Sequence, residues 1–201
     1  IRGQALAPKA DGPALLALSL MSPSTPQAEA IIRKYLEGNP RYEVRMDYAR
    51  ALLDTQRYAE SAEQLQHVTA EKPDYSPAWL VRGSLELQDN KPAVAEKSLM
   101  RYIELATAAK AAPDAVDGSR GLTQAYLLLA QIAEQRKDYA QAEQWLAKID
   151  NADDMVRAQS RRASILARQG RLDEARKLLK SLPERNPEEA RAKLTAEVQL
   201  L

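Results

Sequence analysis

Small side chains return at nearly fixed intervals along this chain, and few folds can accommodate such a pattern. One small position falls at Ala49, Gly83, Ala130 and Ala163, with intervals of 34, 47 and 33. A second falls at Ala28, Ser61, Ala95, Ala142 and Ala175, with intervals of 33, 34, 47 and 33. Two apolar positions keep the same four intervals: Ile32, Leu65, Leu99, Leu146 and Leu179; then Tyr35, Val68, Tyr102, Ile149 and Leu182. A period near 34 indicates a repeat architecture.

Each repeat is predicted to be a pair of helices. The segment 41–73, bracketed by Pro40 and Pro73, has the pattern of two helices and a turn. The chain is rich in Ala, Leu, Glu, Gln, Lys and Arg, which favour helices, and it contains only 7 Gly. No run alternates strictly between apolar and polar residues, so a sheet has little support.

The repeated residue types have a physical reason. Small residues let the two helices of a hairpin approach closely, whereas a large residue would push their axes apart. Proline at the end of a repeat lacks the backbone donor that would continue the second helix. A single hairpin cannot bury its apolar face alone, so neighbouring hairpins are expected to stack.

These positions resemble the tetratricopeptide repeat family, whose repeat pattern has large residues at positions 4, 17 and 24, small ones at 8 and 20, and proline at 32. The segment RLDEARKLLKSLPERNP (171–187) is similar to a second helix of that family. The other matches are Trp79 and Tyr126 at position 4, Gly83 at 8, Tyr58, Tyr139 and Leu172 at 17, and Pro40, Pro73 and Pro187 at 32. The resemblance implies an all-α, right-handed superhelical solenoid of antiparallel helix hairpins.

We expect one array over residues 1–201, with hairpins at about 13–37, 42–72, 77–111, 122–149 and 156–183 and a terminal helix at 188–201. In that helix Leu194 and Val198 form the expected packing face, left uncovered. Because the chain starts at Ile1 without Met and ends at Leu201 within an apolar helical pattern, we expect it to be a piece of a longer protein.

Some residues depart from the family pattern. Pro92 stands at position 17, where it is expected to open a helix. Arg82 and Arg162 stand at position 7, which is usually apolar. The one long interval, 47, reflects an insertion near 107–121, where an Ala-rich stretch predicts that a helix continues past Leu105. Pro113 and Gly118 then predict a loop.

No catalytic set is recognisable in the sequence. The chain has no Cys and a single His67, and it contains no Gly-rich phosphate loop or nucleophile motif. Net charge is +1, without a basic block that would indicate nucleic acid. We therefore expect no enzyme activity, no cofactor and no metal, and we interpret Trp79 and Trp145 as packing residues. No apolar stretch is long enough to span a membrane.

The resemblance places a partner-binding groove on the first helix of each repeat, at positions 2, 5, 9, 12 and 13. Glu134 and Ser164 also occupy such positions. A chaperone C-terminus is not the expected ligand, because the Lys and Asn clamp that binds it in one subclass is missing. The candidate groove residues are Met46, Arg50, Leu53, Leu80, Ser84, Leu87, Leu127, Gln131, Arg157, Arg161 and Arg168.

Two properties of this groove are predicted. Arg157, Arg161, Ser164 and Arg168 are spaced four, three and four residues apart, so they share one helical face. They form either a basic strip that binds a carboxylate or an acidic peptide, or a solvated helix face. The leucines and Met46 make the middle of the groove apolar, which suits an extended or helical peptide.

The expected function is a scaffold or adaptor that binds another protein or peptide. The alternatives are a non-catalytic module of a larger enzyme and a module that self-associates through the terminal helix. The segments 121–149 and 161–179 also resemble bacterial periplasmic repeat lipoproteins, some of which act as protease adaptors. That narrower resemblance implies the periplasm or an outer-membrane anchor, while the composition fits the cytoplasm equally well.

Overall fold

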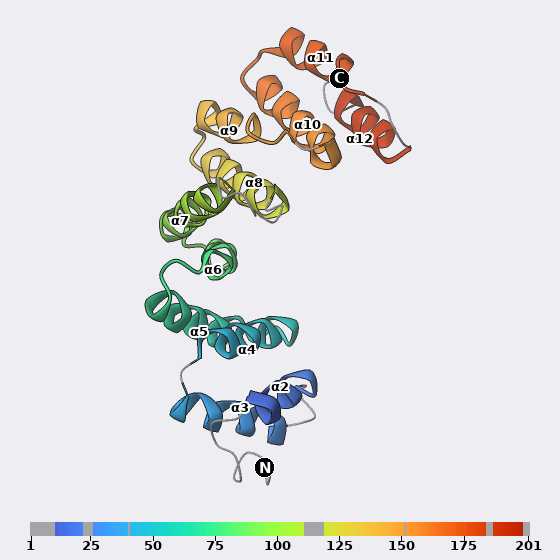
Figure 1. Ribbon diagram of the computed structural model, residues 1–201. Coiled ribbons are helices and arrows are strands. Elements are labelled where there is room, and N and C mark those ends of the chain that lie inside the picture. Colours follow the sequence, from blue (N-terminus) through green and yellow to red (C-terminus); the bar gives the residue numbers. More distant parts are fainter. Residues whose placement is uncertain are drawn as a thin grey trace. The chain divides into compact units, whose positions relative to one another are not determined.

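The computed structural model describes residues 11–21, 26–39, 41–110, 119–150, 152–183 and 187–198. Within these ranges the regular structure is entirely α-helical, and no strand occurs (Figure 1). The chain divides after Leu105 into two compact units, residues 1–105 and 106–201. We describe each unit by itself, and the single array over residues 1–201 stays a prediction.

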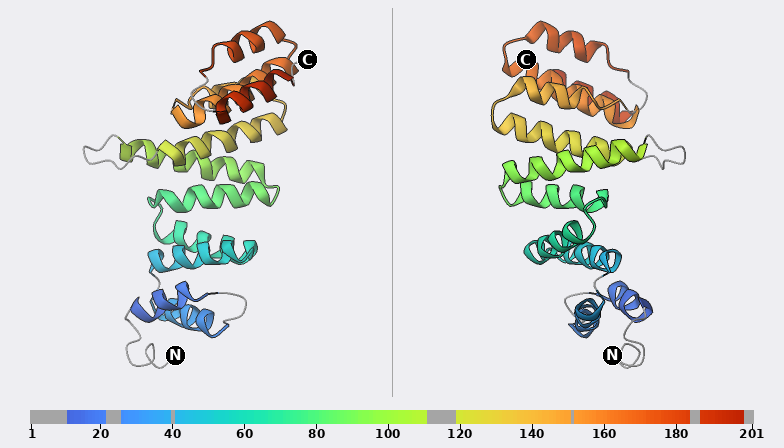
Figure 2. Two further views of the ribbon diagram at one scale, coloured as in Figure 1. Left: turned by 90° about the vertical axis from the view of Figure 1, so that its right-hand side faces the viewer. Right: turned by 60° about the vertical axis from the view of Figure 1, so that its left-hand side comes forward.

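In unit 1, the helix pairs α4–α5 and α6–α7 form hairpins, each joined by a short turn (Figure 2). Helix α4 packs on α5, and α5 packs on α6. The last helix begins at Pro92, as predicted, and continues past Leu105 into the first residues of unit 2. The helices are α2 (Asp11–Ser19), α3 (Pro26–Gly38), α4 (Tyr42–Asp54), α5 (Tyr58–Glu71), α6 (Ser76–Gln88) and α7 (Pro92–Lys110). Pro113 and Gly118, the predicted loop residues, lie outside the described residues.

Unit 2 repeats this arrangement with two hairpins and a further helix. Helix α8 packs on α9, α10 packs on α11, and α12 lies against α10 (Figure 2). Leu194 and Val198 of α12 are exposed, and Ala196 belongs to the core shared with α10. The helices are α8 (Ser119–Gln135), α9 (Tyr139–Leu146), α10 (Ala152–Arg168), α11 (Leu172–Lys180) and α12 (Pro187–Val198).

The hairpin turns share a left-handed residue. Positive φ angles occur at Gln56 (60°), Asn90 (56°), Lys137 (62°) and Gly170 (78°), which follow one another at the intervals that separate the small residues. In each turn the next backbone N–H returns to the end of the first helix, as from Asp138 N to Ala133 O at 2.9 Å. This geometry satisfies helix carbonyls and reverses the chain direction.

The small residues at position 8 lie where two helices meet. Ala49, Ala130 and Ala163 have no exposed surface. A methyl group placed on Gly83 would lie 2.8 Å from Cγ of Leu99, closer than van der Waals contact allows. The absence of a side chain at Gly83 therefore lets α6 and α7 approach each other.

The apolar residues form a series of small cores between neighbouring helices. In unit 1 one core joins α2, α3 and α4, and another joins α4, α5 and α6. In unit 2 one core joins α8, α9 and α10, and another joins α10, α11 and α12. Each core depends on residues from successive helices, so no hairpin is complete on its own.

The two unusual arginines at position 7 are held by polar partners. Arg82 Nε donates to Glu86 at 2.8 Å, its Nη1 donates to the Thr69 hydroxyl at 2.9 Å, and its guanidinium lies 5.3 Å from the ring centre of Trp79. Arg162 donates through Nη1 to Gln159 at 2.8 Å. Arg82 thus has a carboxylate partner at a position where the family usually places an apolar side chain, whereas the buried Nε of Arg162 has no hydrogen-bond partner among the described residues.

Candidate protein-binding surface

The predicted groove residues lie on the first helices of the hairpins, which are α4, α6, α8 and α10. In each unit by itself, we call the surface that these positions present the first-helix face. Four of the candidates are exposed: Arg50, Gln131, Arg157 and Arg168. Five are partly exposed: Leu53, Leu80, Ser84, Leu127 and Arg161. Nine of the eleven candidates therefore present some surface to solvent.

Met46 and Leu87 were predicted wrongly as groove residues. Met46 is 1% exposed and belongs to a core with Ala78 and Leu85 of α6. A long unbranched side chain fills such a space readily. Leu87 is 8% exposed. Both side chains are buried in the folded chain and therefore offer almost no apolar surface to a partner.

The basic strip of α10 is partly neutralised by a carboxylate of α8. Arg161 Nε donates to Glu134 Oε1 at 2.7 Å, and Arg168 Nη1 lies 3.8 Å from Glu134 Oε2. The Glu134 side chain is only 16% exposed, whereas that of Arg168 is 62% exposed. Two of the three arginines thus share one glutamate, and the strip keeps an excess of positive charge.

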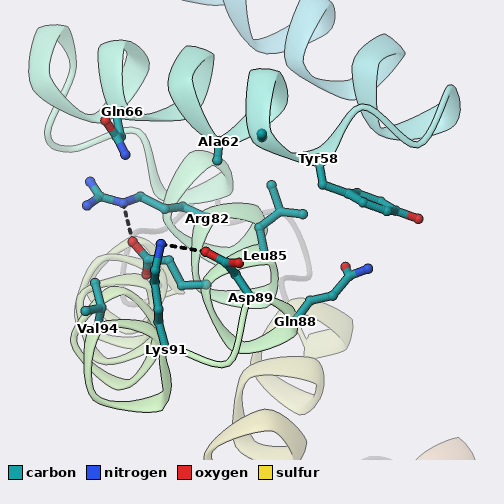
Figure 3. Close-up of a pocket in the computed structure, with 11 residues that line it drawn as sticks. Tyr58, Ala62, Gln66, Arg82, Leu85, Gln88, Asp89, Lys91 and Val94 are labelled. Carbon is teal, nitrogen blue, oxygen red and sulfur yellow. Dashed lines mark hydrogen bonds and ion pairs between the residues drawn. The ribbon is translucent and has the colours of Figure 1, made fainter.

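A cleft of about 500 Å³ lies elsewhere in unit 1, between α5, α6 and the start of α7 (Figure 3). Ala59, Ala62 and Leu85 give it apolar walls, and Tyr58 and Val94 are half-exposed beside it. None of the eleven candidate groove residues lines this cleft, although Gln88, which also occupies a predicted groove position on α6, does. The sequence analysis missed the cleft, because it forms where two small alanines of α5 leave space beside the next repeat.

The charges around the cleft are paired with one another (Figure 3). Arg82 pairs with Glu86 at 2.8 Å, and Lys91 pairs with Asp89 at 2.5 Å. The Ser98 hydroxyl donates to the second oxygen of Glu86 at 2.6 Å. The cleft therefore offers no excess charge of either sign to a ligand.

An ion-pair network fastens the first hairpin of unit 1 to the second. Glu29 of α3 accepts hydrogen bonds from Arg57 at 2.6 and 2.8 Å and from the Tyr48 hydroxyl at 2.8 Å. Arg33 and Glu60 extend the network. The bonds from Arg57 hold the pKa of Glu29 at about 2, and burial together with the bond to Glu29 raises the pKa of Tyr48 to about 12. We assign this network to stability.

The aromatic residues and the histidine have packing or surface positions. Trp79 donates through its indole nitrogen to the Pro73 carbonyl at 2.9 Å. Trp145 stacks on Tyr126, with ring centres 6.0 Å apart. His67 is exposed on α5. Within the described part of the chain, no group of three or more His, Cys, Asp or Glu side chains is placed to hold a metal ion.

None of the described helices combines the length and apolar character that crossing a bilayer requires.

Paired helices, small residues at their contacts and cores shared between neighbours define the class of protein: an all-α helical-repeat scaffold. The tetratricopeptide repeat model matches residues 24–76, 46–115 and 149–190, and a second model of the same repeat matches 123–154. The chain belongs to the tetratricopeptide repeat family. No curated protein sequence matches it significantly.

Several solved structures share this fold. A MamA structure from Desulfovibrio magneticus RS-1 is 15% identical, with 94% of this chain and 97% of that chain covered and a TM-score of 0.66. YrrB, described as a tetratricopeptide repeat protein with an unusual peptide-binding site, is 13% identical, with 99% and 94% covered and a TM-score of 0.69. Pseudomonas aeruginosa pilF is 20% identical, with 96% and 85% covered and a TM-score of 0.63. At these identities the similarity establishes the fold alone.

Proposed function

We propose that this scaffold binds a protein or peptide partner on its first-helix face. Tetratricopeptide repeats are protein-interaction modules, and the fold implies a protein or peptide as the partner. The observation that carries the location is that first helices of each unit present partly exposed leucines, Leu53 and Leu80 in unit 1 and Leu127 in unit 2. Such side chains gain stability when a partner removes them from water.

The test is capture of a partner from an extract of the native organism by the tagged chain. The double variant Leu80→Glu with Leu127→Glu places charges on the first-helix face and is expected to lose the partner. The control is Met100→Glu with Leu172→Glu, which changes two exposed apolar residues of the second helices α7 and α11. Circular dichroism establishes that both variants stay folded. Equal capture by both variants contradicts the proposed location.

As a more specific form of this function, we propose that the chain acts as an adaptor in the bacterial cell envelope. This role is supported by the resemblance of segments 121–149 and 161–179 to periplasmic repeat lipoproteins. Fractionation of cells that produce the whole native protein tests it: the adaptor role predicts the periplasmic or outer-membrane fraction, and a purely cytoplasmic protein rules the role out.

The second candidate function is a non-catalytic module of a larger enzyme. The native sequence on either side of this chain distinguishes such a module from an adaptor. A catalytic domain there would favour the enzyme module, and a lipid-anchored cysteine would favour the adaptor. Self-association through α12 is the third candidate, favoured by the exposed Leu194 and Val198. Light scattering over a range of concentrations tests it, and a monomer throughout excludes it.

A further inference from the structure

The last helix of unit 2 continues the first-helix face. Leu194 and Val198 follow Ser160 and Ser164 by one repeat length, so they occupy the same groove positions on α12 as the two serines on α10. Both side chains are exposed, at 61% and 59%. Ala196, on another side of α12, is buried in the core shared with α10.

The exposed leucine and valine lie beside the basic strip of α10. Helices α10 and α12 pack against each other. The repeat spacing sets Leu194 and Val198 level with the middle of the strip, between Arg157 and Arg168. Two exposed apolar side chains therefore adjoin a row of arginines within one compact unit.

The arginines at the two ends of the strip, Arg157 and Arg168, have guanidinium donors left to bind a partner. Arg157 is exposed and forms no ion pair with any residue in the described part of the chain. Arg168 meets Glu134 only at 3.8 Å, while Arg161 forms the closer pair. Arg157 and Arg168 are eleven residues apart on one helix, a separation of about 16 Å, which about five residues of extended chain would span.

Building on the function proposed above, we infer that this face of unit 2 binds an extended acidic segment of a partner protein, with two carboxylates six residues apart and aliphatic side chains between them. The even spacing keeps both carboxylates and the aliphatic side chains on one side of an extended chain. The carboxylates pair with Arg157 and Arg168, because arginine forms strong paired hydrogen bonds with carboxylates. The aliphatic side chains cover Leu194 and Val198.

A second copy of this chain is a poorer occupant of the same face. In a symmetric contact each patch meets itself, so the arginines of one copy would face those of the other. Like charges brought together across an interface oppose association. An acidic segment supplies the opposite charge and covers the same apolar atoms.

The probe is the fluorescein-labelled peptide Ser-Glu-Ala-Leu-Ala-Leu-Ala-Glu-Ser, measured by fluorescence anisotropy with the full chain. In an extended conformation both Glu and both Leu of this peptide lie on one side. Peptides with both Glu replaced by Gln, or both Leu replaced by Ser, are the ligand controls. Replacing the two Leu separates the proposed mode from simple attraction between an acidic peptide and a basic surface. We expect each change to weaken binding roughly tenfold.

The matching protein variants are Arg157→Gln with Arg168→Gln, and Leu194→Ser with Val198→Ser, which alter exposed residues. Each is expected to weaken binding of the acidic, Leu-containing peptide roughly tenfold. The controls are Arg176→Gln with Lys180→Gln, and Leu172→Ser, which make similar changes on the second helix α11 and should leave binding unchanged. Absence of binding by the unaltered chain, or equal binding by the variants and controls, overturns the inference.

The partner captured from the extract separates this inference from the proposed function. If the variants at Leu80 and Leu127 lose that partner while those at Arg157 and Arg168 and at Leu194 and Val198 retain it, the first-helix face binds a protein but the acidic segment is wrong. If every one of these variants retains the partner, both proposals are wrong. Loss of the partner from all three sets of variants supports both.

Discussion

The Ser61 hydroxyl of α5 donates a hydrogen bond to the backbone carbonyl of Ala49 in α4, at 2.8 Å. Both residues have no exposed surface. They stand at the two small positions of one repeat, so the recurring pattern corresponds to a direct contact between the two helices of a hairpin. A larger side chain at either position would separate a hydroxyl from the backbone atom that it now reaches.

Replacing Gly83 by Ala is expected to destabilise the chain by about 1 kcal/mol, although alanine favours helices over glycine. The added methyl would lie 2.8 Å from Cγ of the fully buried Leu99. The matched control is Gly38→Ala, because a methyl on Gly38 of α3 meets nothing within 4 Å. Urea unfolding of both variants measures the effect. If Gly83→Ala changes the free energy of unfolding no more than its control does, the claim that α6 and α7 approach closely at Gly83 is wrong.

Overpacking at the same repeat position in unit 2 should also be costly. Ala130 has no exposed surface and lies in the core that joins α8, α9 and α10, so Ala130→Leu is expected to destabilise by about 1–3 kcal/mol. Its exposed neighbour provides the control, since Gln131→Leu should change stability by less than about 0.5 kcal/mol. Thermal or urea unfolding distinguishes them, and similar losses from both would argue against this helix contact.

The left-handed turn residues predict a stabilising substitution. Lys137 has φ of 62°, a conformation that glycine adopts more readily than lysine. Lys137→Gly is expected to stabilise by about 1 kcal/mol, measured as a raised urea midpoint. Conversely, Gly170→Ala, at φ of 78°, is expected to destabilise by about 1 kcal/mol. The assigned turn geometry is contradicted if Lys137→Gly lowers the stability of the chain or Gly170→Ala raises it.

The network around Glu29 predicts a dependence of stability on pH. Because its pKa falls from the ordinary 4.5 to about 2 on folding, the carboxylate stabilises the fold above pH 4.5, and this contribution is lost as the pH falls towards 2. Glu29→Gln is expected to cost about 2 kcal/mol at neutral pH and to reduce the loss of stability on acidification. Glu63→Gln, at an exposed position of α5, is the control. The account fails if acid destabilises Glu29→Gln as much as the unaltered chain.

The sequence predicted the parts of the fold that depend on side-chain size. Ala49, Ala130 and Ala163 recur because a close helix contact excludes anything larger, and all three are fully buried. The turns were predicted, but the left-handed residue within each of them was not, although these residues follow the same intervals. Their left-handed residues, Gln56, Asn90, Lys137 and Gly170, share a backbone conformation and no side-chain property that a residue pattern would reveal.

The candidate surface was harder to predict than the fold. A repeat position indicates the side of the helix that a residue occupies, but neighbouring residues decide how much of its side chain stays exposed. Met46 is withdrawn into the core beside the small Ala78. Arg161 is engaged by Glu134, at 2.7 Å, from a helix one repeat away. Both outcomes depend on contacts between distant segments of the chain.

Site-specific photo-crosslinking tests most directly whether the partner binds the first-helix face. A photoreactive amino acid is placed at Arg50 or Gln131, which are exposed on the first helices α4 and α8, at Gln66 beside the cleft of unit 1, or at Gln144 on the second helix α9. Because all four side chains reach solvent, the label should preserve the fold. We predict that partner protein is crosslinked from Arg50 and Gln131 and not from Gln66 or Gln144. Crosslinks from Gln66 or Gln144 alone would contradict the account and place the partner on the second helices.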